Sequence, residues 1–141
     1  MKTSDKGIAL IIKHEKCRLS AYQDSAGNWT IGYGHKGGVR KGQVITKQKA
    51  NDFLRKDLAS VENAINAKKY RLTQGQFDAL VSLFYNLGTG AIKKYGFHPL
   101  LKQNPNSEVV PAKIKRYVYS GGSVQGGLVI RRSEEVQLYN S

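Results

Sequence analysis

Apolar residues recur at helical spacing near the start of the chain. Ile8, Ile11 and Ile12 are followed by Glu15, at positions i, i+3, i+4 and i+7. Side chains at this spacing share one face of a helix. The pattern therefore predicts a helix over about 4–16, whose apolar stripe ends in a carboxylate.

The periodicity changes after this helix. Residues 24–28 form a dense turn signal, and residues 29–33 combine aromatic and β-branched side chains, as strands do. Five glycines between residues 32 and 42 would break any helix there. We therefore expect a small hairpin or meander over about 21–45.

From Thr46 onward the pattern is helical again. A 3.6-residue period of apolar positions predicts the longest helix of the chain, over about 46–67. Thr73 and Gln76 form a capping-box pattern, and Gly88 is a natural end for the helix that follows. Shorter helices are expected at 99–102, 108–119 and 130–139.

These elements predict an α+β fold in one domain spanning 1–141. A small β lobe at about 15–45 is expected to connect through the helix at 46–67 to a mainly α-helical lobe at about 70–141. The helix at 4–16 is expected to pack on that second lobe. Two lobes joined by one long helix leave a cleft between them, which is a common place for a substrate site.

The chain carries a large positive charge that is spread along its length. Its 141 residues include 23 Lys and Arg against 10 Asp and Glu, for a formal net charge of +13. Residues 1–70 hold 14 basic and 6 acidic side chains, and residues 71–141 hold 9 and 4. An even distribution argues against a basic tail added to a neutral domain. It indicates an anionic partner, such as nucleic acid, acidic lipid or an acidic polysaccharide.

Other features narrow the class of protein. A single cysteine excludes an internal disulfide framework and a cysteine-rich zinc site, and the three histidines lack metal-ligand spacing. The apolar run at 8–12 is far shorter than the ~20 residues that span a bilayer. No small-residue cleavage site follows it. We expect a protein made in the cytoplasm without a signal peptide, with no stable membrane insertion.

Glu15, Asp24 and Thr30 are candidates for the hydrolysis of a glycosidic bond. A glycosidase needs one carboxyl group that is protonated, to donate to the leaving oxygen, and a second that is ionised. Glu15 follows an apolar stripe near a helix C-terminus, which favours the neutral acid, while neighbouring basic residues favour the charged form. Asp24 lies in a polar turn that keeps it ionised, and the hydroxyl of Thr30 can hold a water beside it.

Taken singly, each of these residues has a simpler explanation. A glutamate at the end of an amphipathic stripe is usually a solvated edge residue. Aspartate before Ser-Ala-Gly-Asn is ordinary turn chemistry, and threonine in a strand reflects β-propensity. Only their combination and spacing favour an enzyme.

That combination resembles a known family. The stretch from Glu15 to His35 is similar to the signature of phage-type, T4-lysozyme-like endolysins of glycoside hydrolase family 24. The family pattern is Glu, eight residues, Asp, five residues, Thr, and the chain matches it without a gap. Blocks at 72–80, 84–88 and 127–135 also resemble the helical lobe of the family, so the resemblance covers nearly the whole chain.

The resemblance implies a role for each matched residue. Glu15 matches the general acid, Asp24 the second catalytic carboxylate and Thr30 the threonine that helps to place the nucleophilic water. The implied outcome is inversion, with the two carboxyl groups about 6.5–9.5 Å apart. His35 closes the same motif and is expected to support the geometry of the site. The expected substrate-binding residues are His35, Lys36, Tyr85 and Asn86.

The resemblance also implies an activity and a partner. We expect a muramidase that hydrolyses the β-1,4 bond between N-acetylmuramic acid and N-acetylglucosamine in peptidoglycan, without a metal or organic cofactor. It would act as a monomer, and its basic surface suits a polyanionic substrate. As a phage or prophage lysis protein it would reach the cell wall through a holin-made lesion, although a virion-borne role is also open.

Three other functions are compatible with parts of the sequence. A basic nucleic-acid-binding module would explain the charge, but the chain has no RNP, KH or zinc-finger pattern. A lysozyme-like fold kept for wall binding alone would not need Glu15, Asp24 and Thr30 together. A lytic transglycosylase would form a 1,6-anhydro end without water, and the presence of Asp24 and Thr30 favours a hydrolase instead.

Two adjacent arginines near the C-terminus need an explanation of their own. Arg131 and Arg132 lie in a stretch that is expected to form an exposed helix. We expect both to be solvated or ion-paired with Glu134 or Glu135.

Overall fold

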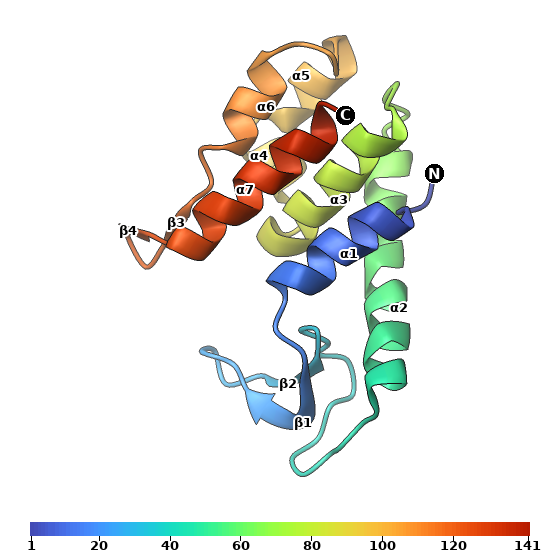
Figure 1. Cartoon of the computed structure of the whole chain (residues 1–141), viewed down its shortest axis with the longest axis vertical. Coiled ribbons are helices and arrows are strands. Elements are labelled where there is room, and N and C mark those ends of the chain that lie inside the picture. The colour runs from blue at the N-terminus through green and yellow to red at the C-terminus, as the bar shows by residue number, and fades with distance from the viewer.

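The computed structural model describes residues 1–141 and divides them between a small β lobe and a helical lobe (Figure 1). This arrangement confirms the predicted α+β fold with a long helix between two lobes. In chain order, the elements are α1 Asp5–His14, β1 Arg18–Gln23, β2 Trp29–Gly32, α2 Lys47–Asn66, α3 Gln74–Leu87, α4 Ala91–Lys94, α5 Phe97–Gln103, α6 Val109–Ile114, β3 Tyr119–Ser120, β4 Ser123–Val124 and α7 Gly126–Tyr139.

Helix α1 begins as its sequence predicts and ends two residues before the expected end. The side chain of Ser4 accepts a hydrogen bond from the Gly7 N–H, which satisfies one of the free donors of the first turn. The helix ends at His14, and Glu15 is the C-cap residue, with an extended backbone. The buried face packs on α3 and α7 in the helical lobe. Glu15 therefore stands where the chain leaves the helical lobe for the β lobe.

The β lobe is built on one short antiparallel pair. Strands β1 and β2 pair with Tyr22 opposite Thr30 and Gln23 opposite Trp29, and an irregularity interrupts the register toward Arg18. An isolated bridge between Ser20 and Val44 adds the return of the chain beside β1, as expected for a meander. A sheet this small is marginal in water unless it packs on other elements.

Helix α2 connects the two lobes. It has 20 residues, which corresponds to a length of about 30 Å. Thr46 caps its first turn by accepting from the Lys49 N–H, and the helix ends at Asn66, close to the predicted bounds. Figure 1 shows it running from the β lobe along the side of the helical lobe. Neither this helix nor any other in the chain combines the length and apolarity needed to cross a membrane.

Helix α3 forms the centre of the helical lobe. Residues 76–84 are all buried, and α1, α2 and α7 pack around them (Figure 1). The predicted capping box is present, because Thr73 and Gln76 bond reciprocally, side chain to backbone. Gly88 ends the helix with φ +89, a conformation that residues with a side chain rarely adopt.

The second half of the chain departs from the predicted pattern in several places. Helix α7 begins at Gly126, four residues before the expected start, and α6 ends at Ile114, five residues before its expected end. Between α6 and α7, the strands β3 and β4, of two residues each, form a small hairpin. Neither this hairpin nor α4 was predicted. Gly126 and Gly127 form the first turn of α7, although both are exposed and glycine has a low helix propensity.

A close contact of Gly7 with its neighbours generates a stability prediction. A Cβ on Gly7 would lie 2.6 Å from Thr3 Cγ2 and 2.8 Å from Asp78 Cγ. Asp78 cannot easily move, because its Oδ1 accepts from the Ser4 N–H at 2.9 Å and from Gln74 Nε2 at 2.8 Å. The clash, about 1–3 kcal/mol, exceeds the gain of about 1 kcal/mol that alanine brings to a helix.

We therefore expect Gly7→Ala to lower the free energy of unfolding, measured by urea denaturation. Gly127→Ala is the matched control, because Gly127 is also helical and a Cβ there has nothing within 4 Å. This control should be neutral or more stable by up to about 1 kcal/mol. Equal stabilisation by both substitutions would contradict the packing described for α1.

Candidate active site

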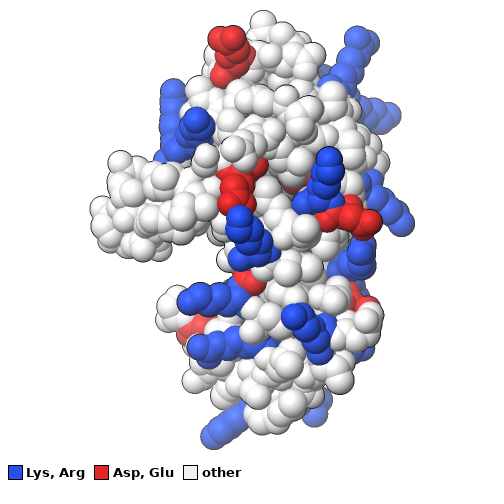
Figure 2. All heavy atoms as spheres, in the orientation of Figure 1, with Lys and Arg blue, Asp and Glu red and all other residues white.

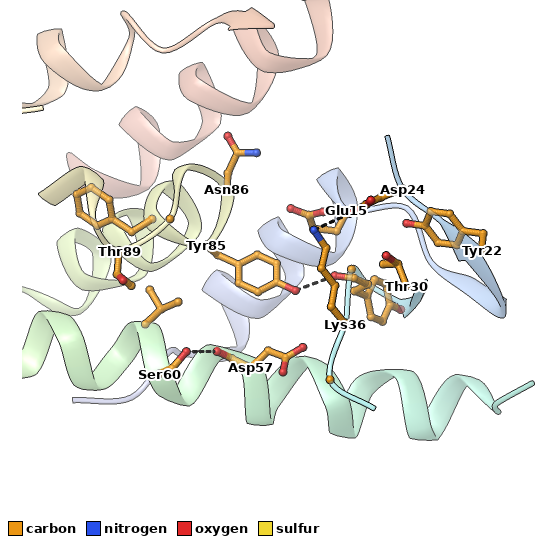
Figure 3. A pocket seen from close by; sticks show the side chains of 16 residues that line it. Glu15, Tyr22, Asp24, Thr30, Lys36, Asp57, Ser60, Tyr85, Asn86 and Thr89 are labelled. Atoms are coloured by element: carbon orange, nitrogen blue, oxygen red, sulfur yellow. Dashed lines mark hydrogen bonds and ion pairs between the residues drawn. The ribbon is translucent and has the colours of Figure 1, made fainter. Parts of the chain in front are cut away.

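A cavity of about 630 Å³ lies between the β lobe and the helical lobe. Six of the seven predicted site residues line it, and Figure 3 shows that they come from both lobes, with the Asn86 side chain pointing away from the others. Its predicted lining residues are Glu15, Asp24, Thr30, Lys36, Tyr85 and Asn86. His35 alone lies outside the lining.

Glu15 is held by an arginine from a distant part of the chain. Arg131 Nη1 donates to Glu15 Oε1 at 2.8 Å, across 116 residues of sequence. The Arg131 side chain is 4% exposed and that of Glu15 is 23% exposed. Glu15 Oε2 forms no hydrogen bond within the chain. One carboxylate oxygen is thus fixed, and the other is free to meet a ligand.

Arg131 is itself held by a buried polar network. Its Nη2 donates to the Ser82 carbonyl oxygen at 2.9 Å, and its Nε lies 3.4 Å from Glu135 Oε2. Ser82 Oγ donates to the same Glu135 oxygen at 2.6 Å. These contacts join α3 and α7, so they fix Glu15 to the helical lobe.

The sequence-based prediction for the two arginines was only partly right. Arg132 Nη1 donates to Glu135 Oε1 at 2.6 Å and its Nε donates to the Tyr117 carbonyl oxygen at 2.8 Å. Both arginines are therefore ion-paired with Glu135, which was one of the two expected outcomes. Neither is exposed, because α7 turns this face toward α3. The contact of Arg131 with Glu15 has no signal in the sequence.

Asp24 is surrounded by hydrogen-bond donors. Its Oδ1 accepts from the N–H groups of Ala26 and Asn28, both at 2.9 Å, and its Oδ2 lies 2.8 Å from Lys36 Nζ. The Lys36 ammonium, followed by the Asn28 N–H, lowers the pKa of Asp24 from 3.8 to about 2. Asp24 is therefore a carboxylate at neutral pH, as predicted from its polar turn.

Thr30 lies at the floor of the cavity and is 1% exposed. Its Oγ1 donates to the Asn28 carbonyl oxygen at 3.0 Å. Because a hydroxyl has one proton, its lone pairs are left to accept a hydrogen bond from a ligand or a water. The same turn therefore positions the Asp24 carboxylate and the Thr30 hydroxyl.

His35 supports the site from outside the cavity. Its Nδ1 lies 2.9 Å from Asp57 Oδ2 on α2, and its Nε2 lies 2.9 Å from the Gly37 carbonyl oxygen. Its ring stacks on Phe53, with 4.0 Å between ring centroids. These contacts occupy both ring nitrogens, and the ring does not line the cavity.

Tyr85 connects the two lobes at the cavity. Its hydroxyl donates to the Tyr33 carbonyl oxygen at 2.7 Å (Figure 3). Burial, followed by the negative charges of Glu15 and Asp57, raises the pKa of Tyr85 above its ordinary value. The phenol is therefore neutral over the whole physiological pH range.

Basic and acidic side chains occupy different parts of the surface around the cavity. Figure 2 shows Lys and Arg side chains over both lobes of the visible face, with acidic groups inside the hollow between them. The hairpin that projects above this hollow belongs to a stretch, 117–130, without any charged residue. No group of three or more His, Cys, Asp or Glu side chains is arranged to hold a metal ion. Three carboxyl groups line the cavity, those of Glu15, Asp24 and Asp57, and the surroundings of Glu15 and Asp24 differ.

The sequence is similar to known proteins along nearly its whole length. The family model for phage lysozyme matches residues 12–135. The chain is 39% identical to an endolysin of Acyrthosiphon pisum secondary endosymbiont phage 1, over all of this chain and 99% of that protein. It is 41% identical to an endolysin of Bacillus phage PZA, of which it spans 56%.

Solved structures give the same result. The muramidase domain of SpmX from Asticaccaulis excentricus superposes with a TM-score of 0.90 at 32% identity, covering 99% of this chain and 98% of that one. The fold and the sequence thus agree along nearly the full length, and the chain belongs to the phage lysozyme family.

Proposed function

We propose that this protein is a muramidase that hydrolyses the β-1,4 bond between N-acetylmuramic acid and N-acetylglucosamine in bacterial peptidoglycan. Membership of the phage lysozyme family and its endolysin and muramidase relatives support lysis of the cell wall as the activity. The observation that carries the proposal is the placement of Glu15 and Asp24, which line one cavity from two lobes.

In this proposal Glu15 is the general acid. Its Oε2 is free of internal hydrogen bonds and carries the proton to the leaving oxygen of the glycosidic bond. The Arg131 guanidinium at Oε1 then stabilises the carboxylate that remains after the proton has left. The arginine also fixes the direction in which the acid points.

Asp24 and Thr30 act on the water in this proposal. The ionised Asp24 accepts a proton from the attacking water, or orients this water. Thr30 Oγ1 accepts a hydrogen bond from the other proton of the same water. Attack from the face opposite the leaving group inverts the anomeric carbon. Lys36 and Asn86 remain proposed sugar contacts, because both line the cavity.

The charge of the surface supports the proposed substrate. Peptidoglycan carries carboxylates, and a net charge of +13 distributed over both lobes attracts a polyanionic mesh without selecting one orientation (Figure 2). Action as a monomer and release to the wall through a holin-made lesion stay predictions.

Replacing the proposed acid tests the assignment directly. Glu15→Gln keeps an oxygen for Arg131 but has no proton to donate. We expect the rate at which purified cell walls lose turbidity to fall by at least about 100-fold, the contribution of a general acid.

Glu134→Gln is the matched control for this substitution. Glu134 pairs with Lys13 at 2.6 Å and with His14 at 3.0 Å, and it does not line the active-site cavity. This variant should lyse walls at the parent rate. If Glu15→Gln also lyses walls at the parent rate, Glu15 is not the general acid.

The ion pair of Asp24 generates a pH prediction. Lys36→Met removes the largest cause of the low pKa, so the pKa of Asp24 should rise from about 2 toward 3.8. Since the ionised form is the active one, activity should be lost at a higher pH as the medium is acidified. An NMR titration of the Asp24 carboxyl carbon measures the shift.

Lys41→Met removes the same charge from an exposed position of the same lobe, where no carboxylate lies within 4.0 Å of the amine. The pKa of Asp24 should stay near 2 in this control. An equal rise in both variants would assign the low pKa to net charge and not to the Lys36 contact.

A further inference from the structure

The two proposed catalytic carboxylates belong to different lobes. Glu15 is fixed to the helical lobe through Arg131, which bonds to Ser82 of α3 and Glu135 of α7. Asp24 is fixed within the β lobe through Lys36 and its own turn. Their separation therefore depends on how the lobes are held relative to each other.

A hydrogen bond spans the lobes at the floor of the cavity. Tyr85, on α3, donates its hydroxyl proton to the carbonyl oxygen of Tyr33, which directly follows β2, at 2.7 Å. Tyr33 is 3% exposed, so water competes little for its backbone. A Cβ on Gly34 would lie 3.7 Å from the Tyr85 oxygen, which shows how closely the phenol lies against this peptide.

The segment that contains Tyr33 also contains Lys36, which pairs with Asp24. Residues 33–37, here called the strap, contact three other parts of the chain. Tyr33 accepts from Tyr85, His35 bonds to Asp57 of α2, and Lys36 pairs with Asp24. The strap is also bridged to β2, from His35 to Ile31, and β2 pairs with β1 across the Asp24 turn, so a shift of the strap away from α3 would carry that turn with it.

We propose that Tyr85 is a positioning residue whose hydroxyl holds the strap against α3 and thereby sets the separation of Glu15 and Asp24. The effect of Tyr85 on catalysis rests on the proposed function. The hold of the Tyr85 hydroxyl on the strap does not depend on that function. It differs from a role in sugar binding, for which the ring of Tyr85 would be sufficient.

The protonation of Tyr85 suits this role. Burial and the adjacent Glu15 and Asp57 carboxylates favour the neutral phenol, so the proton is available over the working pH range. Because the single proton is given to Tyr33, the oxygen can only accept a hydrogen bond from a substrate. A sugar group that meets Tyr85 must therefore be a donor, such as a hydroxyl or an acetamido N–H.

Tyr85→Phe separates the two roles, because it keeps the ring and removes only the hydroxyl. We expect kcat on purified peptidoglycan to fall by about 10-fold with KM within about two-fold of the parent, the pattern of a displaced catalytic group. A raised KM with unchanged kcat would overturn the proposal, because it would mean that the Tyr85 hydroxyl contacts a sugar and does not position the strap.

Tyr139→Phe is the matched control. Tyr139 is buried, whereas Tyr85 is half-buried. The Tyr139 hydroxyl likewise donates to a backbone carbonyl, that of Pro105, at 2.5 Å, but both of these residues belong to the helical lobe. The two variants should lose similar amounts of stability to urea, and only Tyr85→Phe should lose kcat. An equal loss of kcat in both would assign the effect to general destabilisation.

A distance measurement tests the structural part without catalysis. Spin labels on Lys41→Cys in the β lobe and Lys93→Cys in the helical lobe, with Cys17→Ser, report the distance between the lobes. Tyr85→Phe should broaden this distribution, while Tyr139→Phe should leave it unchanged. A distribution unaffected by Tyr85→Phe would overturn the proposal even if the protein is a muramidase, and a broadened one would support it even if the protein is not.

Discussion

The buried guanidinium of Arg131 is the contact on which the site depends most. It bonds to Glu15, Ser82 and Glu135, and so links the end of α1 to both α3 and α7. Removing one member of a buried ion pair leaves an uncompensated charge, at a cost of about 3–5 kcal/mol. The same network therefore stabilises the helical lobe and directs one carboxyl group toward the cavity.

The β lobe depends on contacts outside its own sheet. A two-stranded pair is marginal alone, and here the lobe is held by His35, which bonds to Asp57 and stacks on Phe53 of α2. The turn that joins β1 and β2 uses the Asp24 carboxylate to order its backbone. The Asp24 carboxylate thus has both a structural and a proposed chemical role, and the Lys36 ammonium lowers its pKa further below neutral pH.

Local patterns in the sequence predicted the elements whose causes are local. The stripe ending at Glu15, the capping box at Thr73 and the span of α2 all follow from spacing and caps within a few residues. The start of α7 was misjudged, because the low helix propensity of Gly126 and Gly127 favoured a loop, whereas both residues form the first turn of the helix. Of the predicted residues that line the cavity, Glu15, Asp24 and Thr30 were candidates from their own chemistry, and the family resemblance added Lys36, Tyr85 and Asn86. Contacts between distant residues were not predictable. Arg131 meets Glu15 across 116 positions and Tyr85 meets Tyr33 across 52, and no periodicity records such pairs.

In the proposed mechanism, Glu15 of the helical lobe protonates the leaving oxygen and Asp24 of the β lobe acts on the water that attacks the glycosidic bond. Digestion of purified peptidoglycan in water labelled with heavy oxygen, followed by mass spectrometry and NMR of the released fragments, tests it most directly. One labelled oxygen is expected at each new reducing end, which should be an N-acetylmuramic acid released first as the α anomer. An unlabelled 1,6-anhydro end would contradict the account, because it would mean that the bond is broken without water.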